Sequence, residues 1–274
     1  MFKIPAKDLV WAIHSPQVMG IINCTSDSFY AASRQENIDS VLSKVAQFVK
    51  EGVSIVDIGA QSTRPNAPLL SADLEIEQLV PVVHGIRHAY PNLLISIDTF
   101  YASVAAASLE AGANIINDIS CGSFDPAILA VVAQQKAGFI GMHLSGSIQS
   151  MHTIEAREDI MASLLSFFAE KKKVLSAVGI QQWVIDPGFG FGKTIEENFK
   201  LVRELAILKK IGLPVLLGAS RKSSIYKTLG VSAEEALNGT TMVNTIALLN
   251  EVNILRVHDV KEAVELVQLL PHLK

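Results

Sequence analysis

The sequence predicts a single (β/α)8 barrel, an α/β fold in which eight parallel strands alternate with eight helices. Eight short apolar runs alternate with eight helical patterns along the 274 residues, and no linker-like or low-complexity stretch interrupts them. The runs are continuously apolar, as expected of parallel strands that are covered on both faces. A doubly wound sheet is the alternative, but this repeat count and length favour one barrel domain over residues 1–274. Residues 1–16 precede the first run, and we expect this N-terminal extension to form a hairpin that closes the barrel bottom.

The predicted strands are rich in β-branched residues, which pack well on a pleated surface. In chain order they are VMGIIN (18–23), SIVDIG (54–59), LLISID (93–98), NIINDI (114–119), FIGMHL (139–144), WVID (183–186), PVLLGAS (214–220) and ILRVHD (254–259).

The segments between these runs have helical periodicity. The first, over 38–52, ends in a glycine stop, and the second, over 71–90, opens with a serine cap. The other helical patterns cover 102–111, 125–136, 157–178, 196–211, 233–250 and 260–270.

Composition excludes several classes of protein. Hydrophobic residues make up 49% and charged residues 18%, as in a soluble globular protein. The formal net charge of −4 provides no basic surface for nucleic acid. No apolar run reaches membrane-spanning length, and the N-terminus lacks a signal-peptide core. Cys24 and Cys121 form no spacing motif, so we expect reduced thiols and a cytoplasmic protein.

The stretch DPGFGFGKT (186–194) ends in Gly-Lys-Thr, as a phosphate-binding P-loop does. A P-loop has a glycine five places before the last glycine of this motif, where the chain has Pro187. Proline has a fixed φ and no backbone N–H, so it can neither make that turn nor donate to a phosphate. The mismatch counts against an ATPase.

Polar residues follow nearly every predicted strand. They are Asn23, Gln61 to Arg64, Asp98, Asn117 with Asp118, His143, Asp186, Ser220 to Lys222, and Arg256 with His258. The carboxyl ends of all strands in a barrel meet at one face, where barrel enzymes build their active sites. The sequence therefore predicts one site made from all these strand ends.

In order along nearly the whole chain, the motifs resemble those of the dihydropteroate synthase family. They are GIINCTSDSF (20–29), QSTRP (61–65), IDT (97–99), INDI (116–119), MH (142–143), DPGFGFGK (186–193), SRKS (220–223) and RVHD (256–259). The resemblance implies a (β/α)8 barrel that joins 6-hydroxymethyl-7,8-dihydropterin pyrophosphate to p-aminobenzoate. The products are pyrophosphate and 7,8-dihydropteroate, in folate synthesis.

The resemblance also implies a pterin pocket. It consists of Asp98, Asn117, Met142, Asp186, Phe191 and Lys222. The edge of a pterin ring offers adjacent donors and acceptors, so Asp186 is expected to accept from ring N–H groups while Asn117 both donates and accepts. Met142 and Phe191 are the expected apolar walls.

The other implied residues bind pyrophosphate and p-aminobenzoate. Thr63, Arg64, Arg256 and His258 are expected to hold phosphate oxygens, and Asn23 to ligate Mg²⁺, a hard cation that prefers oxygen ligands. Phe29 and Pro65 are expected to flank the benzoate ring, while Ser223 and the adjoining helix start receive its carboxylate. The implied catalytic residues are Lys222, Arg256, His258 and Asn23. The family is typically homodimeric through its barrel helices.

The loops depart from the family pattern N-x-T-P-D-S-F-S-D-G-G. Ser26 replaces its proline, Ala31 its second aspartate, and residues 32–33 its glycine pair, while Gln61 stands where the second loop usually has glutamate. The third loop, IDTFY, lacks the usual lysine. Asp27 is the nearest carboxylate that can compensate for Ala31.

Three alternatives to the synthase remain open. A pterin-dependent methyltransferase shares the barrel and the pterin pocket but does not need the motifs SRKS and RVHD. A non-catalytic pterin-binding paralogue agrees with the altered first loop but not with the complete set of pyrophosphate residues. A Schiff-base aldolase with Lys222 as nucleophile leaves the Asp and Asn residues of the pterin edge unexplained.

Overall fold

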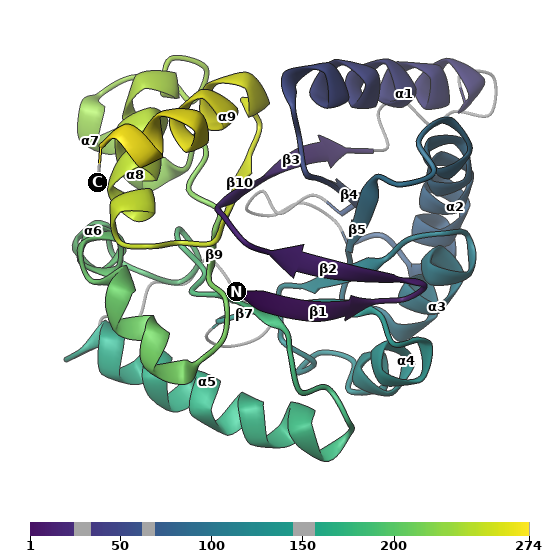
Figure 1. Ribbon diagram of the computed structural model, residues 1–274, viewed down its shortest axis with the longest axis horizontal. Coiled ribbons are helices and arrows are strands. Elements are labelled where there is room, and N and C mark those ends of the chain that lie inside the picture. The colour runs from purple at the N-terminus through teal and green to yellow at the C-terminus, as the bar shows by residue number, and fades with distance from the viewer. Residues whose placement is uncertain (25–33, 62–68, 145–156, 274) are drawn as a thin grey trace.

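The computed structural model describes residues 1–24, 34–61, 69–144 and 157–273 (Figure 1). Its main sheet has eight parallel strands in the order β8-β7-β6-β5-β4-β3-β10-β9. A bridge between Ile185 and Val215 joins the two ends of this order, so the sheet closes into the predicted barrel. The strands are β3 (Gln17–Asn23), β4 (Ile55–Gly59), β5 (Leu94–Asp98), β6 (Ile115–Asp118), β7 (Gly138–Met142), β8 (Val184–Asp186), β9 (Leu216–Leu217) and β10 (Ile254–Val257).

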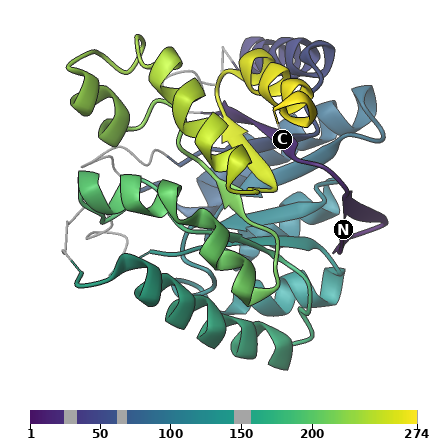
Figure 2. The same ribbon diagram turned by 60° about the vertical axis from the view of Figure 1, so that its left-hand side comes forward.

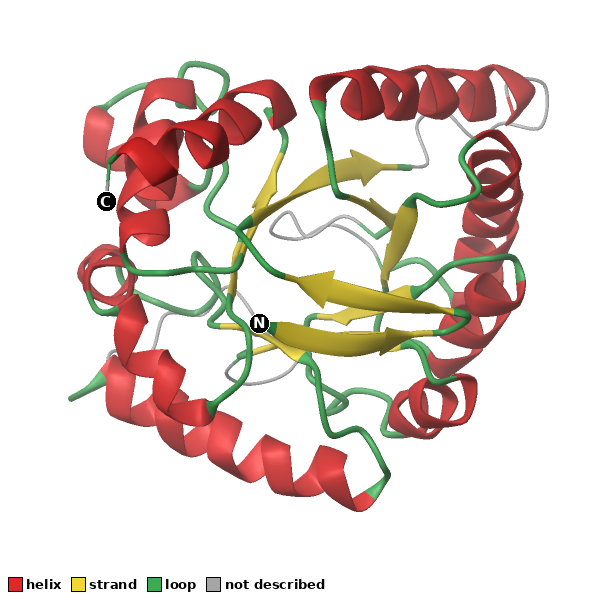
Figure 3. Cartoon of the chain, viewed as in Figure 1, coloured by secondary structure: helices red, strands yellow, loops and turns green. Residues whose placement is uncertain are grey.

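Helices surround the barrel (Figure 3). They are α1 (Arg34–Glu51), α2 (Ala72–Ala89), α3 (Ala102–Glu110), α4 (Ala127–Gln135), α5 (Ile160–Ala177), α6 (Ile195–Arg203), α7 (Ser223–Leu229), α8 (Leu237–Leu249) and α9 (Val260–Leu269), with 3₁₀ segments η2 (Leu205–Ile211) and η3 (Leu270–His272). None of the helices in the described part of the chain is both long and apolar enough to cross a bilayer.

The structure corrects the helical prediction at two places. The pattern over 196–211 is an α-helix only as far as Arg203. After Glu204 it continues as a 3₁₀ helix over Leu205–Ile211, which ends at Gly212 with a φ of 76°. The pattern over 233–250 becomes α8, which begins only at Leu237, and a separate short helix, α7, precedes it. Gly230 ends α7 with a φ of 67°, a conformation that glycine adopts without steric cost.

The N-terminal extension forms the expected hairpin. Strands β1 (Phe2–Ala6) and β2 (Leu9–Ile13) pair antiparallel, and Figure 2 shows them at one end of the barrel. Ile4, Ala6, Trp11 and Ile13 of the hairpin join an apolar cluster with Met19, Ile55, Ile115, Ile140, Val184, Leu216 and Ile254. Each of these last seven residues comes from a different barrel strand, so the hairpin closes the barrel bottom as predicted.

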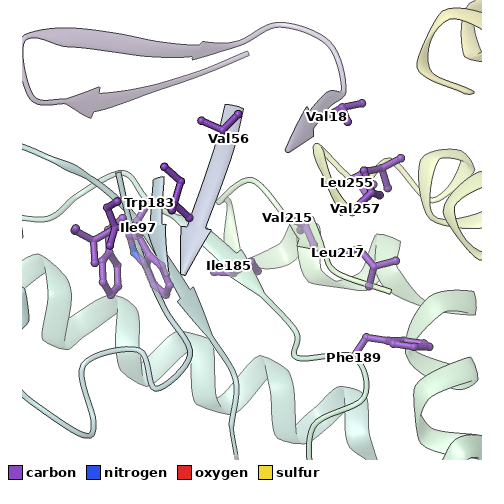
Figure 4. Packing of buried hydrophobic residues seen from close by; sticks show 14 of the residues in the cluster. Val18, Val56, Ile97, Trp183, Ile185, Phe189, Val215, Leu217, Leu255 and Val257 are labelled. Atoms are coloured by element: carbon purple, nitrogen blue, oxygen red, sulfur yellow. The ribbon is translucent and has the colours of Figure 1, made fainter. Parts of the chain in front are cut away.

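Side chains alternate along each strand between the barrel interior and the surrounding helices. The outward set, which includes Val56, Ile97, Trp183 and Ile185, packs against the helices in the main core (Figure 4). Close packing leaves little space there, since a Cβ on Gly20 would lie 2.6 Å from the Phe48 ring. The inward set is apolar at the bottom and polar at the carboxyl ends, which places the site.

Candidate active site

A buried ion-pair network crosses the barrel interior above its apolar bottom. Arg256 of β10 donates through Nε to Oδ2 of Asp57 and through Nη2 to Oδ2 of Asp98, both at 2.6 Å. The Asp57 side chain has no exposed surface, and it also accepts from Ser96 Oγ at 2.6 Å and Asn117 Nδ2 at 3.0 Å. Three neighbouring strands (β4, β5 and β6) and β10 thus hold Asp98, Asn117 and Arg256 in place around the Asp57 carboxylate.

Charge in this network depends on burial. Burial raises the pKa of Asp98 to about 7, although Arg256 opposes the shift. Burial acts against the charge of Arg256, yet Asp57 and Asp98 raise its pKa overall, so the guanidinium stays charged. The centre of the site is therefore a permanent cation between two carboxyl groups.

Asp186 lies at the end of β8, where the next residues turn sharply. Its Oδ1 accepts from the backbone N–H of Gly188 at 2.7 Å, and burial raises its pKa while Lys222 opposes the shift. Gly188 has a φ of 70°, and a Cβ there would lie 2.2 Å from the carbonyl oxygen of His143. Only glycine allows this backbone to pass so close to β7.

The lysine of the P-loop-like motif is a buried structural cation. Lys193 Nζ lies 3.1 Å from His143 Nδ1 and donates to the carbonyl groups of Gly188 at 2.9 Å and Phe191 at 3.2 Å. Burial lowers the pKa of Lys193 to about 7, and burial together with Lys193 lowers that of His143 to about 3. Thr194 then caps α6 in a capping box with Glu197. The motif thus braces the Asp186 turn from inside.

An apolar wall stands beside the network. It contains Phe100, Ile119, Met142 and Phe191, all buried. Lys222 lies across it, with Nζ 4.1 Å from the centre of the Phe191 ring and in contact with the carbonyl oxygen of Phe189. Burial lowers the pKa of Lys222 to about 7, while Asp186 acts to raise it.

The strand ends of β9 and β10 hold the remaining basic groups. Ser220 Oγ contacts both Nδ1 and the backbone N–H of His258, at 3.0 and 3.2 Å. Arg221, which has a φ of 53°, makes a bidentate ion pair with Asp259 at 2.8 and 2.9 Å. Its side chain is thereby directed away from Lys222, its neighbour in the sequence.

The structure brings most of the predicted site residues to one face of the barrel. Asp98, Asn117, Met142, Asp186, Phe191, Lys222 and Arg256 are linked there by the contacts above. Asn23 is exposed at the end of β3, His258 follows β10, and Ser223 is the first residue of α7. The predicted residues Phe29, Thr63, Arg64 and Pro65, and also Asp27 and Ala31, lie outside the described residues.

Sequence reasoning missed Asp57, Ser96 and Lys193. Asp57 and Ser96 were polar residues inside otherwise apolar strands, which is a signal that they face a partner in the interior. Lys193 stands in the P-loop-like motif, which suggests a phosphate ligand and gives no sign of its partner His143.

The structure also gives a reason for the glutamine at the end of β4. Gln61 Nε2 donates to Glu75 Oε1 at 2.5 Å and to the Leu70 carbonyl at 3.0 Å, while its Oε1 accepts from the Leu70 N–H at 3.1 Å. Glu75 is fully buried and also accepts from Thr99 Oγ1 at 2.9 Å. A glutamate at position 61 would face a second carboxylate, so the family's usual residue does not suit this chain.

We therefore expect Gln61→Glu to destabilise the protein by about 1–3 kcal/mol at neutral pH, because Glu75 loses a donor and gains a like charge. Two facing carboxyls share a proton, so the folded-state pKa of the pair rises above its unfolded value. The loss is then small at low pH and grows as pH rises through that folded pKa. Denaturant unfolding of the wild type and of Gln61→Glu between about pH 5 and 8 measures this loss of stability.

The exchanged double variant, Gln61→Glu with Glu75→Gln, is the matched control, because it restores one amide facing one carboxylate. Its stability should exceed that of Gln61→Glu and depend less on pH. A Gln61→Glu variant as stable as the wild type at every pH would refute this account of the pair.

Comparison with known proteins agrees with this geometry. A family model described as pterin binding enzyme matches residues 19–258. The dihydropteroate synthase of Synechocystis sp. is 40% identical over 247 residues, which cover 89% of this chain and 85% of that protein.

Solved structures extend the comparison to the fold. Yersinia pestis dihydropteroate synthase in complex with a sulfonamide drug has a TM-score of 0.92 at 34% identity, and the match covers 99% of both chains. Xanthomonas albilineans dihydropteroate synthase with 4-aminobenzoic acid has a TM-score of 0.90 at 30% identity, covering 99% of this chain and 97% of that one. With the barrel, its polar mouth and these matches in agreement, this chain belongs to the dihydropteroate synthase family of pterin-binding enzymes.

Proposed function

We propose that the chain uses its barrel mouth to join 6-hydroxymethyl-7,8-dihydropterin pyrophosphate to p-aminobenzoate, with release of pyrophosphate. The observation that carries the proposal is the set of Asp98, Asn117 and Asp186 near Arg256, next to an apolar wall; Asn117 and Asp186 are buried, and the Asp98 side chain is 19% exposed. A pterin has one polar edge and two apolar faces. Fixed acceptors and donors beside a wall such as Phe191 match that shape and chemistry.

The pterin edge faces Asp186 and Asn117 in this proposal. Asp186 accepts from ring N–H groups, since a carboxylate has several acceptor positions and the Gly188 N–H takes only one. The Asn117 nitrogen donates one of its two N–H groups to Asp57, so its second N–H and its carbonyl oxygen are the groups that donate to and accept from the ring. Asp98 supplies the third polar contact, and Met142 and Phe191 enclose the ring faces.

Pyrophosphate binds at the basic side of the mouth. Asp57 and Asp98 take two of the five Arg256 N–H groups in the described structure, and the other three point to no described acceptor. Together with His258 they bind the departing oxygens, on which negative charge accumulates in the transition state. Thr63 and Arg64, from outside the described residues, complete this proposed pocket.

A Mg²⁺ ion fits the same side. Among the described residues no group of three His, Cys, Asp or Glu side chains could hold a metal by itself. Asn23 offers an exposed amide oxygen at the end of β3, which suits a hard cation that takes its other ligands from substrate phosphates and water. When bound, the ion would neutralise charge on the pyrophosphate.

The amine substrate approaches from the β9 end. Lys222 lies over the Phe191 ring and interacts electrostatically with Asp186, so we assign it contacts with both substrates; Ser223 follows it at the start of α7. We assign the benzoate carboxylate to these two residues, with Phe29 and Pro65 at its ring.

We also propose a cytoplasmic homodimer that forms through α8. This helix exposes Met242, Ile246 and Leu249, which are spaced along one face and have 59%, 41% and 48% of their surface accessible. Such an apolar face is typical of an association surface. Sedimentation velocity measures the oligomeric state, and a monomer at all concentrations would contradict the dimer.

The direct test of function is turnover with both substrates. We expect dihydropteroate formation that falls strongly in EDTA, because removal of the ion leaves the pyrophosphate charge uncompensated. Calorimetry should show that EDTA weakens binding of pterin pyrophosphate but not of a pterin without phosphates. Equal turnover with and without EDTA would exclude the metal role.

The same assay separates the synthase from the paralogue. Binding of pterin pyrophosphate without turnover would select the non-catalytic paralogue, and a silent wild type rescued by Ala31→Asp would locate the defect in the first loop. An active wild type that loses activity in Asp27→Ala would support Asp27 as the compensating carboxylate.

A further inference from the structure

The imidazole of His258 is held by one hydroxyl group, that of Ser220. Strands β9 and β10 are neighbours in the barrel, and the two residues follow them. Ser220 Oγ lies 3.0 Å from His258 Nδ1 and 3.2 Å from the His258 backbone nitrogen. The next residue on each side, Arg221 and Asp259, forms a bidentate ion pair that ties the two strand ends together. This pair keeps the hydroxyl against the ring.

The two contacts decide where the hydroxyl proton lies. A backbone N–H can only donate, so Ser220 Oγ is the acceptor in its contact with the main chain of His258. Ser220 is 5% exposed, and within the described residues its hydroxyl has no other partner. Its one proton is therefore donated to Nδ1. If Nδ1 carried a proton instead, the hydroxyl would accept twice and leave its own proton buried without an acceptor.

The surroundings also favour an uncharged ring. Partial burial lowers the pKa of His258, and the positive charge of Arg256 lowers it further, as do Arg221 and Lys222. Asp259 acts in the opposite direction, but its carboxylate is already paired with Arg221. His258 is exposed at the end of β10, so a bound ligand can reach its ring. A neutral imidazole that accepts at Nδ1 carries its proton on Nε2.

We propose that Ser220 is a positioning residue that holds His258 as the neutral, Nε2-protonated tautomer, so that the ring presents an N–H donor to the substrate pyrophosphate. The tautomer follows from the two Ser220 contacts alone, whereas the use of the donor rests on the function proposed above. A neutral donor complements Arg256, which supplies the permanent positive charge. It stabilises phosphate oxygens without bringing a second cation close to the guanidinium.

The tautomer is measured by two-bond ¹H–¹⁵N spectra of protein labelled at histidine nitrogen, with His258→Gln to assign the signal. His143 provides an internal reference, since its Nδ1 faces the Lys193 ammonium at 3.1 Å and must also accept. Burial lowers the pKa of Lys193 to about 7, so at about pH 6 the lysine is charged and both histidines should show the Nε2-protonated pattern. A His258 signal protonated at Nδ1, or at both nitrogens, would overturn the proposal.

Substitutions test whether Ser220 is the cause. Ser220→Ala should add Nδ1-protonated His258 and leave His143 unchanged, and Ser220→Thr should restore the wild-type spectrum. Thr240→Val is the matched control, because it removes a hydroxyl that accepts from the Arg221 backbone N–H at 3.0 Å without touching His258. This control should lose stability but keep the His258 tautomer. A histidine spectrum of Ser220→Ala identical to that of the wild type would also refute the proposal.

Kinetics separately test whether the His258 N–H donor is used at the substrate pyrophosphate. In Ser220→Ala, kcat should fall about three- to tenfold, the value of one hydrogen bond, while affinity for a pterin without phosphates stays unchanged. Ser220→Thr should recover kcat. If the spectra behave as expected but kcat does not change, the tautomer assignment stands and the assigned use at the pyrophosphate is wrong. A protein with no turnover at all would contradict the proposed function and leave the spectroscopic result intact.

Discussion

Replacing Arg256 with methionine is expected to lower turnover by about 10²–10³-fold, the loss typical when a preorganised group that stabilises transition-state charge is removed. The substitution also leaves the fully buried carboxylate of Asp57 and the largely buried carboxylate of Asp98 without their cation. Breaking a buried pair in this way costs about 3–5 kcal/mol of stability, much more than losing a surface pair. Steady-state kinetics and denaturant unfolding measure the two effects.

Arg203→Met is the matched control for Arg256→Met. Arg203 pairs with Glu196 at 2.9 Å, but both side chains are more than half exposed, so we expect less than about 0.5 kcal/mol and full activity. An additional Asp57→Asn change in the Arg256→Met background should recover part of the stability, because it removes the unpaired charge, but none of the turnover. Wild-type kcat in a folded Arg256→Met variant would place the leaving group elsewhere.

Asp186→Ala should weaken pterin binding at least about tenfold. The change removes a buried acceptor that faces ring donors, and a hydrogen bond to a charged group is worth about 1.5–3 kcal/mol. The carboxylate is 7% exposed, so water cannot easily replace it. Calorimetry with a pterin lacking phosphates isolates this contact from the phosphate and metal contributions.

Asp118→Ala is the control for a buried carboxylate at a strand end. Asp118 has no exposed surface, but its oxygens accept from Ser120 and the Gly122 N–H in the loop after β6. The variant should be less stable than the wild type and bind the pterin with similar affinity. Unchanged affinity in folded Asp186→Ala would mean that the ring binds somewhere else.

Most helices and strands are predictable from the sequence. Continuous apolar runs of four to seven residues predicted the strands, because a strand covered on both faces needs no polar side, and all eight pair in one parallel sheet. The errors occurred where helical periodicity continues through a change of backbone. The pattern over 196–211 keeps one apolar face across Glu204, although the hydrogen-bonding changes there from α to 3₁₀.

The residues of the site are likewise only partly predictable from the sequence. Asp98 and Asp186 end predicted strands, while Asn117 and Arg256 lie in the carboxyl-terminal halves of β6 and β10, and parallel strands in a barrel carry these ends to one face whatever the exact register. Asp57 lies in the middle of its strand, and its importance depends on Arg256, 199 positions away in the sequence. No local pattern contains that pairing.

The amino-acid sequence alone is enough to predict the barrel, its closing hairpin and the face on which the polar residues gather. These depend on the period of apolar residues and on turn-forming glycines, which are local properties of the chain. The partners of the polar side chains become visible only in the folded chain: Asp57 pairs with Arg256, Lys193 with His143, and Ser220 with His258. A buried polar group pairs with whichever complementary group the closed barrel places within about 3 Å, and strand register sets that distance.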